Sequence, residues 1–160
     1  YKKIPFNQKP LKVSGAGILR KYRMRPRWAM KREWGYDKLK KYSRPYCFNK
    51  LKKNKCVNFL DKMDLISYFH HFNNYKFTLS PFGNGPDCHR TWEALTLNTI
   101  PIVKTSPLDV VYKKNNLPVV IVNDWTDITE ENLKKWNQQF SHHFETNFYN
   151  KLHIHNFFKI

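Results

Sequence analysis

The sequence predicts an α/β domain with a Rossmann-like three-layer architecture and a mostly parallel sheet, and three observations lead to this prediction. From residue 55 onward, short apolar segments typical of strands alternate with segments of helical periodicity. Residues 117–122 are so apolar that both faces of their strand must be covered, which is typical of a parallel sheet. A loop that contains Gly83 and Gly85 directly follows one predicted strand and directly precedes a predicted helix.

The first part of the chain, residues 1–54, is predicted to be a basic N-terminal segment, either the start of the domain or an interdomain region. A short strand is expected over residues 11–15, and residues 20–34 are a helix candidate after the break at Pro26. Residues 38–55 mix Lys, Tyr, Pro and Asn without clear periodicity. We therefore expect this last stretch to be surface loop.

The Rossmann-like domain itself is expected to occupy residues 55–160, with elements in the order β-α-β-α-β-β-α. Its predicted strands are residues 56–60, 75–80, 100–104 and 117–122. No helix is expected between the last two strands. Because the carboxyl ends of parallel strands meet at one edge of the sheet, we expect the ligand there.

Three segments of this domain are predicted to be helices. The first carries apolar residues at helical spacing, namely Leu65, Ile66, Phe69 and Phe72. The second covers residues 89–97, which lack Gly and Pro. The third begins among the polar residues 127–131, which offer caps and early carboxylates. Its apolar face is predicted to be Leu133, Trp136, Phe140, Phe144 and Phe148.

Charge is distributed very unevenly along the chain, whose formal net charge is +17. Residues 1–60 contain 19 Lys or Arg against only Glu33 and Asp37, whereas residues 61–160 contain 10 basic and 10 acidic residues. A segment this basic requires an anionic partner, and phosphate, nucleic acid, an acidic glycan and an anionic membrane all fit. Charge alone does not choose among them.

Several features bear on the compartment and on bound metals. No segment approaches the roughly 20 apolar residues of a membrane span, so a soluble domain is expected. The three cysteines form no C-x-x-C pair, which favours reduced thiols in a compartment such as the cytoplasm or a virus factory. The histidine doublets place adjacent rings about 100° apart on a helix, so no metal site is predicted. Because the sequence begins at Tyr1, we expect a fragment, a mature form or a cut domain.

The segment from Ser80 to Glu93 carries the pattern that points to chemistry. Gly83, Asn84 and Gly85 allow close approach of backbone to a ligand, and a helix N-terminus follows them. Arg90 in the first turn offers a bidentate donor suited to a diphosphate, and Glu93 could accept hydrogen bonds from ribose hydroxyls. The alternative is a plain tight turn, with Arg90 and Glu93 as a surface ion pair and Trp92 and Leu95 in the core.

The run SPFGNGPDCHRTWEALTLNTIPIVKTSPLDVVY, followed by LPVVIVNDW, resembles the C-terminal domain of exostosin-like glycosyltransferases of the GT-B fold, including versions in large DNA viruses, algae and bacteria. The resemblance covers residues 75–136 well and residues 1–60 poorly, although Val13-Ser14-Gly15 followed by Arg20 is similar to the segment that opens the family's nucleotide-binding domain. It implies that the chain is the C-terminal half of a GT-B fold. The family's Gly before the Ile-Pro strand is replaced by Asn98-Thr99.

The resemblance implies a role for each matched residue. Arg90 and Arg20 would hold the diphosphate, Glu93 the ribose, and the loop from Gly83 to Asp87 would lie against the sugar or phosphates. Further donor contacts would come from the residues after the next strand, namely Lys104, Thr105 and Ser106. The implied activity is transfer of a sugar from a nucleoside diphosphate sugar, with a UDP-sugar favoured, to a glycan or glycoprotein acceptor.

This chemistry needs no cofactor and no metal, because GT-B enzymes usually stabilise the departing diphosphate with cationic side chains and a helix N-terminus. No D-x-D pair of carboxylates occurs, in agreement with a metal-independent site. An inverting enzyme also needs a base, which in a GT-B enzyme normally comes from the other domain; Asp87 and His89 are the local candidates.

Two other functions compete with sugar transfer. The basic segment, with its Tyr and Trp residues, fits a nucleic-acid-binding or virion-packaged protein that contacts phosphates and stacks on bases. The chain also fits a glycosyltransferase-like domain that kept the fold and lost turnover.

Overall fold

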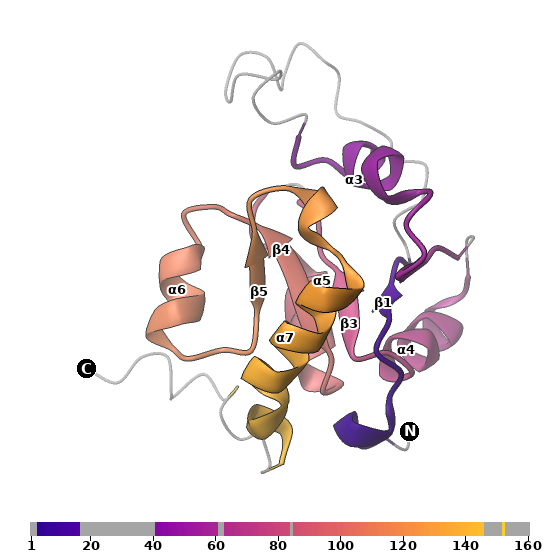
Figure 1. Ribbon diagram of the computed structural model, residues 1–160, viewed down its shortest axis with the longest axis vertical. Coiled ribbons are helices and arrows are strands. Elements are labelled where there is room, and N and C mark those ends of the chain that lie inside the picture. Colours follow the sequence, from indigo (N-terminus) through magenta and orange to yellow (C-terminus); the bar gives the residue numbers. More distant parts are fainter. Residues whose placement is uncertain (1–2, 17–40, 61–62, 84, 146–151, 153–160) are drawn as a thin grey trace.

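The computed structural model describes residues 3–16, 41–60, 63–83, 85–145 and 152. The helix candidate over residues 20–34, together with the predicted donor residues Arg20 and Asn84, lies outside these described residues. Five strands form one sheet in the order β2-β1-β3-β4-β5, and every neighbouring pair is parallel (Figure 1). The predicted α/β architecture with a parallel sheet is therefore confirmed.

Each strand is short and falls inside the segment that the sequence predicts for it. The strands are β1 (Val13–Ser14), β2 (Val57–Asn58), β3 (Phe77–Leu79), β4 (Ile100–Lys104) and β5 (Val120–Val122). β4 matches its prediction at both ends, whereas β5 begins after Pro118, which lacks the N–H that a ladder requires.

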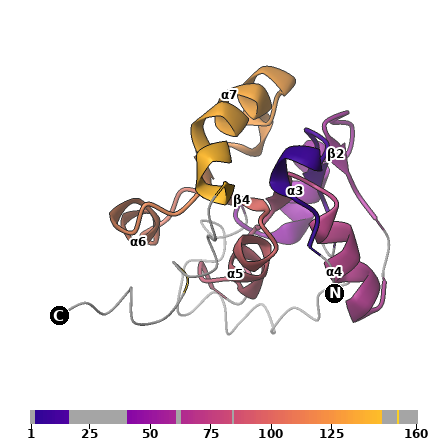
Figure 2. The same cartoon turned by 90° about the horizontal axis from the view of Figure 1, so that it is seen from below.

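Helices cover both faces of the sheet. The α-helices are α3 (Arg44–Leu51), α4 (Leu65–Asn73), α5 (His89–Thr96), α6 (Asp109–Lys114) and α7 (Glu130–Phe140). Short 3₁₀ turns are η1 (Phe6–Gln8), η2 (Trp125–Asp127) and η3 (Ser141–Phe144). α4 and α5 lie on one face and α7 on the other, which gives the three layers seen end-on in Figure 2. Across the described residues, no helix is long and apolar enough to cross a membrane.

Alternation along the strands divides the core between the two faces. In β4, Ile100 and Ile102 join the main apolar cluster with Leu133 of α7, while Val103 joins a second cluster with Leu95 of α5. A third cluster joins α4 and α5 through Phe72, which is fully buried. Because side chains alternate along a strand, a single apolar strand supplies both layers.

Two helices appear where the sequence predicts none. Residues 38–55 were expected to be loop, but α3 forms there: Ser43 accepts a hydrogen bond from the Tyr46 backbone N–H, and Pro45 occupies the first turn. The prediction was wrong because Cys47 and Leu51, one turn apart, are the only buried side chains of this eight-residue helix, too few to show a period. The six-residue α6 between β4 and β5 is too short to show a periodic apolar pattern.

The predicted apolar faces of two helices are partly corrected. α7 ends at Phe140 and continues only as η3, and Phe148 lies outside the described residues. In α4 the predicted apolar residues divide: Phe72 is buried, whereas Leu65 and Ile66 are 67 % and 69 % exposed. These two sit in the first turn, next to the N-cap Asp64, which is itself exposed.

The contrast between Leu133 and Leu65 gives a test of this packing. Leu133→Ala removes a fully buried side chain from the main cluster and is expected to lower the free energy of unfolding by about 2–5 kcal/mol. The same change at exposed Leu65 is expected to alter it by no more than about 0.5 kcal/mol. Urea denaturation of both variants measures the difference, and equal losses would contradict the assignment of α7 to the core.

Candidate functional site

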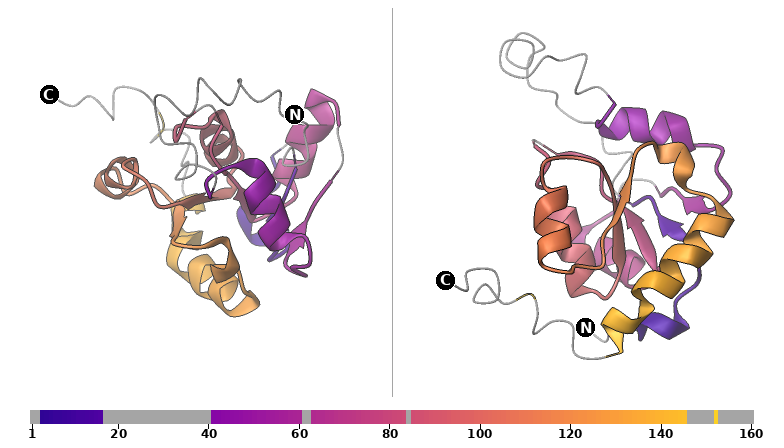
Figure 3. Two further views of the ribbon diagram at one scale, coloured as in Figure 1. Left: turned by 90° about the horizontal axis from the view of Figure 1, so that it is seen from above. Right: turned by 60° about the vertical axis from the view of Figure 1, so that its left-hand side comes forward.

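The strand order places a topological switch point between β1 and β3. In the sheet, β2 lies on one side of β1, and β3, β4 and β5 follow in order on the other side. In open α/β sheets, ligands bind outside the carboxyl ends of the strands at such a point. Here β1 is followed by Gly15 and Ala16, and β3 by Ser80 and the glycine loop. α3 lies beyond the same ends of the strands (Figures 1 and 3).

Arg90 stands in the first turn of α5, and its side chain is only 5 % exposed. One terminal nitrogen, Nη1, lies 3.9 Å from the Cys88 sulfur, a weak acceptor. The Nε atom is buried without a hydrogen-bond partner, and no carboxylate within the described residues forms an ion pair with Arg90. A guanidinium is thus buried at a helix N-terminus without an ion-pair partner among the residues that the structure describes.

Lys104 is a second buried cation at the same edge. It ends β4, is 4 % exposed, and donates a short hydrogen bond from Nζ to the Asn123 carbonyl. Asp124 lies 4.0 Å from Nζ and is partly open to solvent. The backbone N–H of Thr126 holds the pKa of Asp124 below its usual range, and the charge of Lys104 acts in the same direction. Asp124 therefore remains a carboxylate at neutral pH.

Two neutral groups, a thiol and a phenol, also lie near the cations. Cys47 of α3 is completely buried; burial raises the pKa of its thiol, while the charges of Arg90 and Lys104 oppose the rise. Burial likewise raises the pKa of Tyr68 on α4, and Arg90 again opposes it. Both side chains stay protonated at neutral pH, so neither neutralises the cations. Because the charges of Arg90 and Lys104 both act on the Cys47 thiol, the two cations lie in one region of the molecule.

Glu93 is held by a residue that the sequence did not single out. The Tyr68 hydroxyl donates to Glu93 Oε2 at 3.0 Å, and Glu93 is half-buried. The surface ion pair between Arg90 and Glu93 does not form among the described side chains, because Arg90 turns inward instead. The same alternative placed Trp92 and Leu95 in the core. Leu95 is fully buried there, and Trp92 packs against the second cluster. Tyr68 carried no sequence signal, since its contact to Glu93 spans 25 positions.

The glycine loop leaves room beside its backbone. A Cβ built on Gly83 would lie 3.6 Å from the Cys88 sulfur, an ordinary contact, and one on Gly85 would meet nothing within 4 Å. At Gly15, in contrast, a Cβ would lie 2.6 Å from the Phe59 ring. Packing therefore requires glycine at position 15, whereas the chain's own packing does not require it at 83 or 85.

The remaining predicted residues have local structural partners. Asp87 is exposed and accepts a hydrogen bond from Trp92 Nε1 at 2.8 Å, and His89 is exposed. Thr105 donates to Asp109 Oδ2 at 2.6 Å, and the Ser106 N–H donates to Asp109 Oδ1 at 3.0 Å. Thr105 and Ser106 thus fasten the start of α6, while Asp87 is tied to α5.

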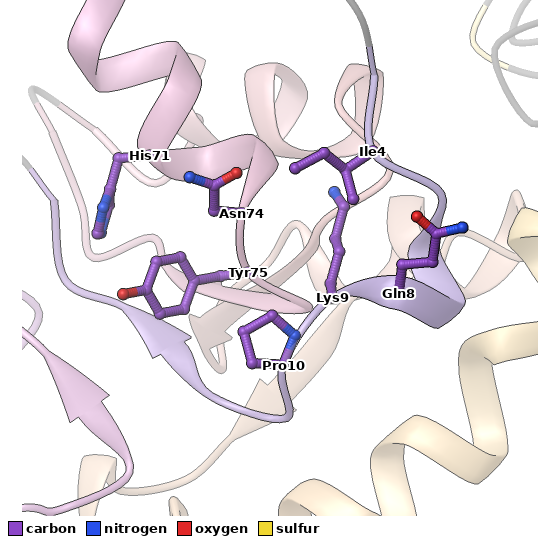
Figure 4. Close-up of a pocket in the computed structure, with 7 residues that line it drawn as sticks. All are labelled: Ile4, Gln8, Lys9, Pro10, His71, Asn74 and Tyr75. Atoms are coloured by element: carbon purple, nitrogen blue, oxygen red, sulfur yellow. The ribbon is translucent and has the colours of Figure 1, made fainter.

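A separate pocket of about 360 Å³ opens at the opposite, amino-terminal edge of the sheet (Figure 4). The side chains of Lys9, His71 and Tyr75 border it. Lys9 Nζ donates to the Leu97 carbonyl at 2.7 Å, and also to the Asn98 carbonyl and Thr99 Oγ1. Because this ammonium already caps the C-terminal end of α5, it is not available to bind a phosphate. We therefore place the candidate site at the carboxyl edge.

Neither the family models nor the curated proteins yield a match to this chain.

The buried cations allow a stability test. Arg90→Met removes an uncompensated buried charge and is expected to leave the free energy of unfolding unchanged or to raise it by up to roughly 4 kcal/mol. Lys104→Met deprives the Asn123 carbonyl of its donor and is expected to lower it by about 1–3 kcal/mol. Urea denaturation followed by tryptophan fluorescence compares the two. A larger loss for Arg90→Met would mean that Arg90 serves the fold and not a ligand.

Proposed function

We propose that this chain is the donor-binding half of a GT-B glycosyltransferase, which binds a nucleoside diphosphate sugar and delivers its sugar to a glycan or glycoprotein acceptor. The observation that carries the proposal is Arg90, a buried guanidinium with an unpartnered Nε and no opposing carboxylate among the described residues. Such a charge costs several kcal/mol unless an anion compensates it, on the order of 3–5 kcal/mol for a broken pair. A diphosphate is an anion of suitable charge and geometry.

The surrounding features support the same ligand class. The first N–H groups of α5 carry the positive end of the helix dipole, and Arg90 and Lys104 add two charges at the same edge. In sugar transfer, negative charge develops on the departing diphosphate, and preorganised cations in a water-poor site stabilise it. The proposed roles are diphosphate binding for Arg90 and Lys104, and ribose binding for Glu93.

Access to these cations is part of the proposal. Arg90 and Lys104 are 5 % and 4 % exposed, so a diphosphate contacts them only after a neighbouring segment moves. Residues 85–87 are the best candidate, because an added Cβ on Gly85 would meet nothing within 4 Å and Pro86 and Asp87 are exposed. Thr105 and Ser106 are less suited to donor binding than predicted, since their polar atoms already fasten α6.

Sugar transfer also needs a base near the acceptor hydroxyl, and the sequence offers Asp87 and His89 for it. His89 is exposed and next to Arg90, whereas Asp87 is engaged by Trp92. Of the two predicted bases, His89 is therefore the better placed to accept a proton, and a second domain remains the expected source in a GT-B enzyme. A donor-binding domain without turnover fits the same geometry, and only an assay of transfer separates it from an active enzyme.

Calorimetric titration with UDP, GDP and their sugars tests the proposal. Specific, saturable binding of one nucleotide is expected, and Arg90→Met is expected to weaken it at least tenfold, since a charge-assisted contact contributes about 1.5–3 kcal/mol. Lys134→Met, which removes a cation that is 62 % exposed and paired with Glu130 on α7, is the matched control and should bind normally.

Two results would count against this function. Absence of binding by every nucleotide, in a sample whose unfolding is cooperative, would exclude a donor site. Equal weakening by Arg90→Met and Lys134→Met would mean that the nucleotide responds to net charge and not to the buried guanidinium.

A further inference from the structure

We propose that residues 41–55, together with Phe82, form a surface that binds single-stranded nucleic acid. This surface is separate in chemistry from the candidate donor site, because its cations are exposed. It goes beyond the proposed function, and neither depends on the other.

The sequence of this surface is strongly basic, and the acidic residue that lies near it, Asp124 beside Lys50, comes from the start of η2. Residues 41–60 contain five lysines and one arginine and no acidic residue. Around the C-terminal end of α3, four lysine side chains are exposed within six positions: Lys50, Lys52, Lys53 and Lys55. The negative end of the α3 dipole favours lysine at the end of the helix itself, but Lys55 lies four residues beyond it. A row of exposed lysines without acidic neighbours in sequence attracts a polyanion.

Aromatic rings alternate with these cations, and this alternation distinguishes a nucleic acid from other polyanions. Lys41 Nζ lies 5.3 Å from the centre of the Tyr42 ring, and Lys50 Nζ lies 5.6 Å from that of Tyr46. Buried Lys104 approaches Tyr42 from the strand side at 5.9 Å. Single-strand binders combine a cationic track for the phosphates with rings on which bases stack. An acidic glycan presents charge but no π face.

The position of the rings argues against a purely structural role. Tyr42 and Phe82 stack with centroids 4.4 Å apart and an angle of 17° between their planes. The Phe82 N–H donates to the Tyr42 carbonyl at 3.1 Å, which fixes the pair. Both residues are partly exposed, and neither belongs to the apolar clusters formed by the described residues. The pair is therefore a fixed aromatic surface that the core does not use.

The test is fluorescence anisotropy with a labelled 12-nucleotide single strand of mixed sequence, titrated with the full chain at several salt concentrations. One variant changes the surface lysines to Gln: Lys50, Lys52, Lys53 and Lys55. Its matched control makes the same change at four exposed lysines elsewhere: Lys113, Lys114, Lys134 and Lys135. The variant of the surface lysines is expected to bind the oligonucleotide more than tenfold more weakly. Its slope of log affinity against log salt concentration should fall by about 0.7 per lysine that contacts a phosphate, whereas the control should change neither quantity.

The rings are tested separately from the charges. Tyr42→Leu is expected to weaken binding about five- to a hundredfold without changing the salt slope, and Tyr42→Phe should restore it. Binding of a heparin oligosaccharide by Tyr42→Leu should be unchanged, and cooperative unfolding in urea shows that the variant is folded. An equal loss of oligonucleotide affinity in both lysine variants would mean that binding follows the net charge and not this surface. Tighter binding of heparin than of the oligonucleotide, or no effect of Tyr42→Leu, would overturn the proposal in favour of an acidic glycan surface.

Discussion

Parallel pairing of all five strands is the constraint on which the other features of this molecule depend. Each parallel connection must cross the sheet, so both faces are covered by crossover segments and every strand ends at the same edge. The strands are only two to five residues long, so their ladders contribute few hydrogen bonds. Apolar contact with α4, α5 and α7 therefore holds the sheet, and the carboxyl edge is where polar residues gather.

At that edge, the environment of Arg90 differs from that of an ordinary buried cation. Lys9, at the opposite edge, shows how this chain accommodates a buried ammonium when the role is structural: three oxygen acceptors within 3.1 Å surround it. Lys104 has a carbonyl and a nearby carboxylate. Arg90 has a thiol at 3.9 Å and an unpartnered Nε. Among these three cations, Lys9 and Lys104 have oxygen partners, whereas the Nε atom of Arg90 has no hydrogen-bond partner.

Sequence patterns predicted the elements that can be recognised from neighbouring residues alone. β4 and α5 were predicted almost to the residue, because an apolar run and a helix free of Gly and Pro need no distant partner to be recognised. α3 could not be predicted, since its two buried residues make contacts far away in the chain and are too few to show a period. For the site, residue types indicated Arg90 and Lys104, but not that Cys47 and Tyr68 would surround them. Such contacts arise only when the crossovers bring α3 and α4 to the edge.

Burial separates the two anion-binding roles that the same molecule is proposed to have. The exposed lysines at and after the end of α3 act through a field that salt screens over about 8 Å at physiological ionic strength, so they select for charge density over a length of polymer. A buried guanidinium is screened much less and acts through directed hydrogen bonds, so it selects for the shape of one anion. Raising the ionic strength therefore weakens the first interaction steeply and the second only slightly. By this difference, the two proposed roles are compatible in one chain with a net charge of +17.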